Sequence, residues 1–352
     1  MSAEMPVRKK ATRFRLYAPY ALLALLAVGW SIAWFVIRGR VEHGLDQWLA
    51  AEAAQGRRWT CVDRRVGGYP FRIELTCSGV TLDRPDVTAS TGRLLVVAQV
   101  YAPNHVIAEA AGPLRVEAGG TTAQASWSLL QSSIVSERGR VARVAVVADG
   151  PRIQVTPSNG EPVELTGRKL ELHLRPDPRA DGSFDGAVSA AGTVVPGLDA
   201  LVGGTEPADL ELVAAISRAA EFPARAVPAE LERWRLAGGR LDLTRLSLVK
   251  GPRRVEVKGQ LGLDDQHRID GQVDVATAGL EGLVGRIAGD RSVLGGRLLG
   301  SLLGSPPPAI DQKPAGVPGA PAPRPLPTIR LQDGRAFFGP LPIPNFRLTP
   351  LY

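Results

Sequence analysis

The longest apolar stretch of the chain is an uncharged run of 21 residues, 17–37. An α-helix rises 1.5 Å per residue, so this run would form a helix of roughly 30 Å, long enough to cross the hydrocarbon core of a bilayer. Aromatic residues that favour the membrane interface lie toward its ends. They are Tyr17, Tyr20, Trp30 and Trp34. The pattern predicts a transmembrane helix over residues 17–37.

Five basic residues precede this run, and Arg38 and Arg40 follow it. The bias predicts that residues 1–16 lie in the cytoplasm and that the chain after Arg38 lies on the other side of the membrane. A cleaved signal peptide is the alternative, but its apolar region is usually about 7–15 residues long and ends at a small-x-small site. Here the candidate site, Ser31-Ile32-Ala33, is followed by four more apolar residues. We therefore expect an uncleaved, single-pass signal anchor.

A second helical pattern follows directly. Val41, Leu45, Trp48 and Leu49 recur at helical spacing, and Gly56 is suited to end a helix. Residues 38–56 are therefore predicted to be a juxtamembrane amphipathic helix that continues the membrane helix and docks the following domain. A partner-binding helix is the alternative.

Beyond residue 57 the apolar positions alternate with a period of two, which indicates half-buried β-strands. Leu170, Leu172 and Leu174 alternate with polar residues, and clusters such as Asp149-Gly150-Pro151 separate the runs. The leucines change parity between Leu243 and Leu246, which predicts a β-bulge. We expect a mainly β, mostly antiparallel domain over residues 57–304, built as a groove or a sandwich with a few short helices.

Three C-terminal segments depart from this pattern. Residues 280–303 have apolar positions at helical spacing and many glycines, which favours short helices that cap the sheet; a membrane-surface or groove-gating helix is the alternative. Residues 305–328 contain nine prolines and are predicted to be an extended, disordered linker. Residues 329–352 contain an Asp333-Gly334 turn between two strand-like runs, which predicts a hairpin that packs back on the sheet.

The two cysteines, Cys61 and Cys77, flank the sequence VDRRVGGYPFRIELT. Each lies eight residues from Tyr69, so a hairpin folded about Tyr69 would bring them nearly opposite each other. In an oxidising compartment we expect a structural disulfide. Two free buried thiols remain an alternative, and a redox-active pair is disfavoured because such pairs usually have C-x-x-C spacing.

A basic N-terminus, one membrane helix, an amphipathic helix and Trp59-x-Cys61, followed by Gly67-Gly68-Tyr69-Pro70-Phe71-Arg72 and then Cys77, resemble the bacterial domain of unknown function 2125 family. The resemblance covers nearly the whole chain. The family has no established activity, so the resemblance implies no reaction. It implies an architecture and a compartment, a single-pass protein of the bacterial inner membrane with its bulk in the periplasm.

A weaker resemblance lies further along. Trp234, Gly238-Gly239 and the alternating Leu241 and Leu243, followed by the strands of residues 255–275, are similar to the C-terminal part of AsmA-like proteins. That resemblance implies an envelope protein anchored in the inner membrane, with lipid moving along a long β-groove.

The charge and composition of the chain argue against several classes of function. The formal net charge is +7, but residues 1–40 account for +6 of it, so the rest of the chain has no clustered basic surface of the kind that binds nucleic acid. The four histidines are scattered, and no metal-binding, phosphate-binding or nucleophile motif occurs. We therefore predict no catalytic residues, no metal and no cofactor.

The resulting prediction is a non-enzymatic membrane protein whose apolar β-surface binds lipid or an envelope component. The alternative is a scaffold or assembly factor with a self-packed β-domain that binds another envelope protein, and a hydrolase is a distant third. The residues expected to line the anchored end of an apolar surface, or to be ordinary core, are Trp59, Tyr69, Phe71, Ile73 and Leu75. The sequence leaves the oligomeric state and the identity of the ligand open.

Overall fold

A single long helix opens the fold. The computed structural model describes every residue except 1–12, 139, 197–198, 200–203, 220–226 and 281–321. Helix α1 (Arg13–Ala54) runs for 42 residues without a break and contains an apolar segment long enough to cross a membrane. The two segments for which the sequence predicts a membrane helix and a juxtamembrane helix therefore form one continuous helix. Gly56, with a φ of 78°, follows the helix at the expected place, and the Arg57 amide donates to the Glu52 carbonyl.

The rest of the described chain is mainly antiparallel β-structure in two sheets, as the period-two pattern predicts. The smaller sheet has seven strands in the order β1-β4-β5-β8-β9-β12-β13. Their bounds are β1 (Arg58–Val62), β4 (Gly79–Asp83), β5 (Val87–Thr91), β8 (Leu114–Ala118), β9 (Thr121–Ser126), β12 (Arg152–Thr156) and β13 (Val163–Thr166).

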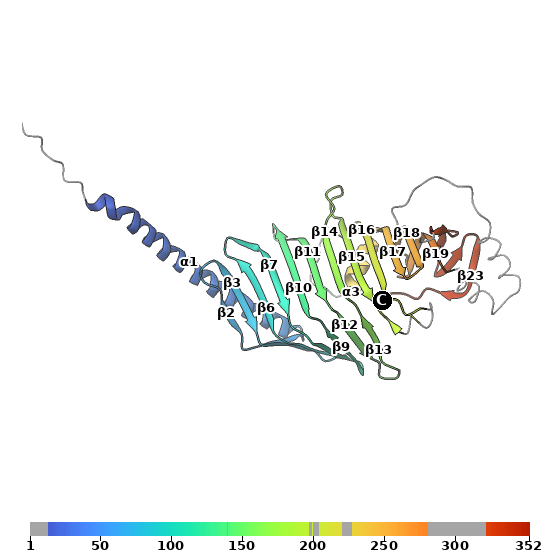
Figure 1. The fold of residues 1–352 in the computed structure, drawn as a ribbon, viewed down its shortest axis with the longest axis horizontal. Coiled ribbons are helices and arrows are strands. Elements are labelled where there is room, and N and C mark those ends of the chain that lie inside the picture. Colours follow the sequence, from blue (N-terminus) through green and yellow to red (C-terminus); the bar gives the residue numbers. More distant parts are fainter. Residues whose placement is uncertain (1–12, 139, 197–198, 200–203, 220–226, 281–321) are drawn as a thin grey trace, which may run out of the picture.

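The larger sheet has sixteen strands and extends well beyond the smaller one (Figure 1). Its first eight strands are β2 (Arg65–Gly67), β3 (Arg72–Cys77), β6 (Leu94–Gln99), β7 (Ala102–Ala110), β10 (Leu129–Glu137), β11 (Arg140–Asp149), β14 (Lys169–Pro176) and β15 (Phe184–Thr193). They are followed by β16 (Ala208–Ile216), β17 (Leu241–Lys250), β18 (Arg253–Leu263), β19 (Ile269–Ala278), β20 (Arg324–Pro325), β21 (Ile329–Gln332), β22 (Arg335–Phe338) and β23 (Leu341–Arg347). The predicted bulge is confirmed, since the register of β17 and β18 shifts between Leu243 and Leu246.

The two sheets are joined by corners, at which the chain passes directly from a strand of one sheet into a strand of the other. Asp149-Gly150-Pro151, for example, connects β11 to β12, and Gly92-Arg93 connects β5 to β6. Backbone hydrogen bonds continue across the corners, as between the Gly150 amide and the Arg168 carbonyl at 2.8 Å. Gly92 allows a close approach, because a Cβ there would lie 3.0 Å from the Ala111 carbonyl oxygen. The two sheets therefore behave as the two walls of one folded sheet.

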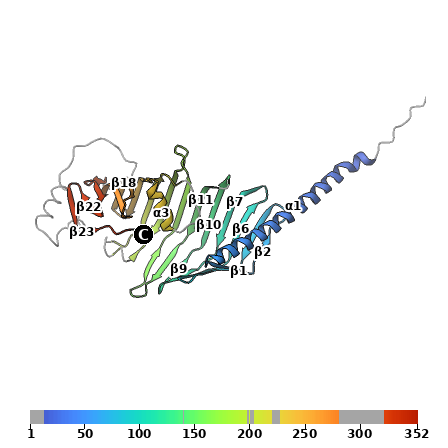
Figure 2. The same cartoon turned by 180° about the vertical axis from the view of Figure 1, so that it is seen from behind.

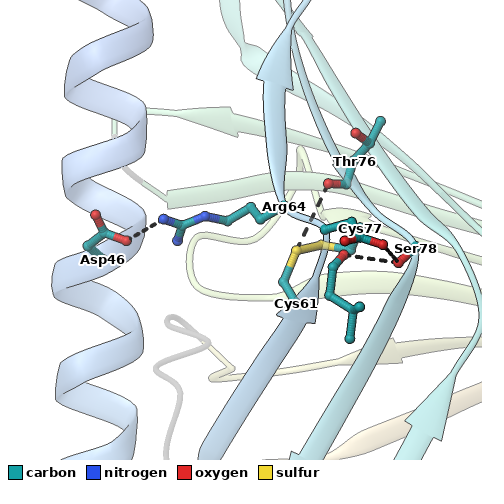
Figure 3. Close-up of a disulfide and its surroundings, with 8 residues drawn as sticks. Asp46, Cys61, Arg64, Thr76, Cys77 and Ser78 are labelled. Carbon is teal, nitrogen blue, oxygen red and sulfur yellow. Dashed lines mark hydrogen bonds and ion pairs between the residues drawn. A yellow bond between two sulfur atoms is a disulfide. The ribbon is translucent and has the colours of Figure 1, made fainter.

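Cys61 and Cys77 form a disulfide, as predicted, but the geometry differs from the expected hairpin. The hairpin consists of β2 and β3, with Arg65 opposite Thr76, whereas Cys61 lies on β1 and pairs with Val80 of β4. The chain turns a corner at Asp63, whose φ is 49°, and this places the two cysteines on different sheets. The disulfide therefore connects the two walls next to the first corner (Figure 3).

The C-terminal half of α1 covers the edge strands β1 and β2, and its N-terminal half projects away from the sheets (Figures 1 and 2). Trp34 of α1 packs with Val66 and Ile73 in a small core. Arg64, at the first corner, pairs with Asp46 of α1 at 2.7 Å (Figure 3). Since an uncovered edge strand invites pairing with other chains, α1 also protects this end of both sheets.

At the other end, the C-terminal hairpin of β21 and β22 adds to the larger sheet, because β21 pairs with β19. The predicted linker is only partly described: Arg324–Pro325 pair with β19, so the last part of that segment is sheet and not a disordered linker. The predicted capping helices of residues 280–303 lie outside the described residues, apart from Leu280. Helix α3 (Val227–Leu236) lies between β16 and β17 in the chain.

Candidate functional site

One face of the larger sheet is a continuous apolar surface. Directly paired residues form a row that crosses eleven strands, from β3 to β19, and ten of its eleven members are apolar. The row consists of Leu75, Val96, Ala108, Ser132, Val146, Leu172, Val188, Leu212, Leu246, Val257 and Val275. With neighbouring strands about 4.8 Å apart, this row is roughly 48 Å long.

The opposite face of the same strands is more polar. The row displaced by one residue includes Glu109, Gln131, Glu171, Ser189, Glu211, Ser247 and Glu256. Because side chains alternate between the faces of a strand, this contrast follows from the period-two pattern of the sequence.

The smaller sheet has the same two-faced character. An apolar row crosses all seven of its strands: Trp59, Leu82, Ala89, Val116, Ala123, Val155 and Val163. The adjacent row, on the other face, is polar throughout: Thr60, Thr81, Ser90, Arg115, Gln124, Gln154 and Glu164. Each wall therefore has one apolar and one polar side.

The apolar faces of the two walls face a common space. A pocket of about 470 Å³ is lined by Ile153 and Leu165 of the smaller sheet together with Leu170, Leu210 and Leu248 of the larger sheet. We call the two apolar faces and the corners between them the apolar trough. The pocket lies where the smaller sheet ends, at β13.

Much of the trough surface is accessible. Leu172, in the middle of the long row, is 39 % exposed. Few apolar residues in the described part of the chain are buried: Trp34, Val66, Ile73, Cys77, Ala148, Phe184, Ala214, Leu243, Ala278 and Ala336. A contiguous apolar surface of this length that is not filled by the described chain is typical of a binding site.

The lining of the pocket also includes charged residues, among them Asp199, Lys250 and Arg253. Lys250, only 7 % exposed, follows Leu246 and Leu248 in the apolar register of β17. Its Nζ donates to Oδ1 of Asp199 at 2.6 Å and to the Glu206 carbonyl at 2.5 Å. Arg253 also lines the pocket, and its Nη1 lies 3.7 Å from Oε2 of Glu206, beyond hydrogen-bonding distance. The sequence signal from which this cluster could have been predicted is a lysine in the apolar register of a strand.

The residues expected to line the anchored end divide into two groups. Ile73 and Leu75 lie on the apolar face of β3, and Trp59 lies on the apolar row of the smaller sheet, where it packs against Trp48 of α1. Tyr69 and Phe71 do not line the trough walls. They lie in the loop between β2 and β3 and contact α1.

That loop is held in a defined conformation. Gly68 has a φ of 96°, and a Cβ there would lie 2.7 Å from the Arg72 carbonyl oxygen, so glycine is required. The Arg72 amide donates to the Gly68 carbonyl at 3.1 Å, which closes the turn.

The described residues contain no group of three or more histidine, cysteine or acidic side chains placed to hold a metal ion.

These features define a class: a mainly β protein with an N-terminal apolar helix and a two-walled antiparallel sheet whose facing surfaces are apolar. The chain belongs to the DUF2125 family, described as uncharacterised proteins conserved in bacteria, whose sequence model matches residues 34–346. No curated protein and no solved structure matches the chain.

Proposed function

We propose that this protein is a membrane-anchored, non-enzymatic lipid-binding protein whose apolar trough holds acyl chains. Helix α1 anchors it in the inner membrane, with the N-terminus in the cytoplasm and the β-domain in the periplasm. The basic residues that precede the apolar run support this orientation.

The observation that supports the proposal most strongly is the apolar row across eleven strands. An acyl chain that spans half of a hydrocarbon core is roughly 15 Å long. A row of roughly 48 Å is therefore long enough for several chains in succession. This length favours binding of lipid along a path over binding of one small molecule. The resemblance to AsmA-like proteins points in the same direction and stays a prediction.

Adjacent positions on β14 provide a matched test. Leu172 lies in the trough, paired with Val188, whereas its neighbour His173 lies on the opposite face, paired with Ala187. A photo-cross-linking amino acid would be placed at either position in the full-length protein in bacterial membranes, and adducts would be identified by mass spectrometry. We expect lipid adducts from position 172 and several-fold fewer from position 173.

Three outcomes would contradict the proposal. Equal lipid labelling from both positions would indicate non-specific contact. A protein adduct at position 172 would favour the alternative role, a scaffold that binds another envelope protein. An adduct with residues 281–321 of the same chain would mean that the chain covers its own trough.

A further inference from the structure

We call residues 67–72 and the adjacent turn at Tyr101 the aromatic tip. Residues 67–72 comprise the loop between β2 and β3 and one strand residue on either side of it. The tip packs against α1. Val100 donates its amide to the Phe71 carbonyl at 2.9 Å, so the β6–β7 turn lies beside the loop. The ring of Phe71 lies 6.1 Å from that of Trp30, and the ring of Tyr69 lies 5.4 Å from that of Trp34.

The position of these contacts along α1 is informative. They involve residues 30–35, which lie inside the uncharged run of residues 17–37. Trp30 is 13 residues after Tyr17, or about 20 Å along the helix, and seven residues before Ile37, or about 10 Å. A helix that needs roughly 30 Å to cross the hydrocarbon core therefore has its last 10 Å in contact with the tip.

The tip is also suited to a water-poor environment. The carbonyls of three successive residues accept hydrogen bonds: Pro70 from the Trp30 indole at 2.8 Å, Phe71 from Val100, and Arg72 from the Trp34 indole at 2.9 Å. The hydroxyl of Tyr69 is 2.8 Å from that of Ser31. Paired backbone groups are what a segment needs in order to enter the bilayer, because an unpaired group there costs several kcal/mol.

The exposed side chains of the tip are three aromatic rings and Arg72, which is 57 % exposed and pairs with Glu74. Tyr69 is 56 % exposed, Phe71 59 % and Tyr101 71 %, although aromatic side chains of this size are suited to packing in a hydrophobic core. Tyrosine is enriched at the membrane interface, where its apolar ring and polar hydroxyl are both accommodated, and exposed phenylalanine anchors interfacial segments.

We propose that the aromatic tip is inserted in the membrane leaflet on the side of the β-domain, in contact with its lipids. This inference rests on the proposed membrane anchor. Phe71 stands two residues before Ile73 and four before Leu75, so an inserted tip brings the first strand of the trough to the level of the leaflet. The trough then begins where acyl chains are available.

The insertion depth can be measured with spin labels. The native cysteines form a disulfide, so an introduced cysteine is the free thiol available for labelling. Phe71→Cys and Tyr101→Cys variants of the full-length protein would be spin-labelled and reconstituted in vesicles of phosphatidylethanolamine and phosphatidylglycerol. We expect the ratio of oxygen to water-soluble nickel accessibility to be several-fold higher at positions 71 and 101 than at Leu236→Cys, an exposed apolar site in α3.

A label at Leu25→Cys, in the free part of α1, distinguishes the possible failures. If positions 71 and 101 resemble position 236 while position 25 lies deep in the bilayer, the tip is not inserted and the proposal is wrong. If position 25 is also in water, the anchor itself is wrong, and the proposal falls with it. Tyr101 lies in an exposed turn, so the proposal remains testable if the Phe71 variant does not fold.

Discussion

The indole Nε1 of Trp34 donates a hydrogen bond of 2.9 Å to the carbonyl oxygen of Arg72, and this contact joins α1 to the start of β3. Trp34 is only 3 % exposed. Trp34→Phe removes this hydrogen bond and is expected to cost about 1 kcal/mol. Trp34→Ala also leaves a cavity beside Val66 and Ile73 and is expected to cost about 3–5 kcal/mol. Guanidinium unfolding of the detergent-solubilised protein would measure both, and equal costs for the two variants would contradict the packing role.

The disulfide connects the two walls and closes a loop of about 15 residues, for which the chain-entropy account gives a stabilisation of roughly 3 kcal/mol. We expect the Cys61→Ser/Cys77→Ser protein to unfold at a lower denaturant concentration by a corresponding amount. Reduced wild-type protein should match it, and reductant should leave the double variant unchanged. A double variant as stable as the oxidised wild type would show that the corner holds without the covalent link.

Lys250 and Asp199 form a nearly buried ion pair in the lining of the pocket. Lys250→Met leaves Asp199 without its partner, and removing one member of a buried pair typically costs about 3–5 kcal/mol. Adding Asp199→Asn should recover part of that loss, because the unpaired charge is removed as well. A double-mutant cycle from unfolding midpoints measures the coupling, and strict additivity of the two changes would mean that the pair contributes nothing.

Leu212 and Glu211 allow the trough to be altered with a matched control. Leu212 lies in the apolar row, and the exposed Glu211 lies on the opposite face of the same strand. Leu212→Asn places an amide on the proposed lipid path and should reduce co-purified phospholipid, whereas Glu211→Asn should leave it unchanged. Lipid phosphorus per mole of purified protein is the measurement. Similar retention in both variants would argue against the trough as the binding surface.

Acid should weaken the C-terminal end of the β-domain. The guanidinium of Arg235 and the hydroxyl of Tyr352 donate hydrogen bonds to Glu232, which lowers the pKa of Glu232 to about 2. Since the folded pKa lies below the ordinary value of 4.5, this contribution to stability is present above pH 4.5 and is lost as the pH falls toward 2. Glu232→Gln should flatten the dependence of the unfolding midpoint on pH between 4.5 and 2. An unchanged pH profile would contradict this assignment.

Sequence patterns within a few residues were sufficient to predict the strand faces, the β-bulge and the end of the helix. The leucines around residues 170–174 define the faces of β14, the parity change after Leu243 marks a bulge, and Gly56 follows the end of α1. Each is encoded within a few residues by side-chain alternation or by a positive φ.

The two-walled arrangement could not be predicted in the same way. Asp149-Gly150-Pro151 resembles a reversing turn, but in the structure the chain passes through it into the other sheet. A tight turn and a corner both use glycine at positive φ, so only the pairing of distant strands distinguishes them. The same limit explains why Cys61 and Cys77 were expected on one hairpin, and why Lys250 was not recognised beside the remote Asp199.

The unbroken course of α1 has a mechanical consequence. A continuous helix of 42 residues is about 63 Å long, and it is fixed to the β-domain at both Trp34 and Asp46. Because the β-domain contacts one continuous helix at two separate points, the domain cannot rotate freely relative to α1. In the proposed membrane-anchored protein, the angle at which the helix leaves the bilayer therefore determines the direction in which the folded sheet extends from the membrane.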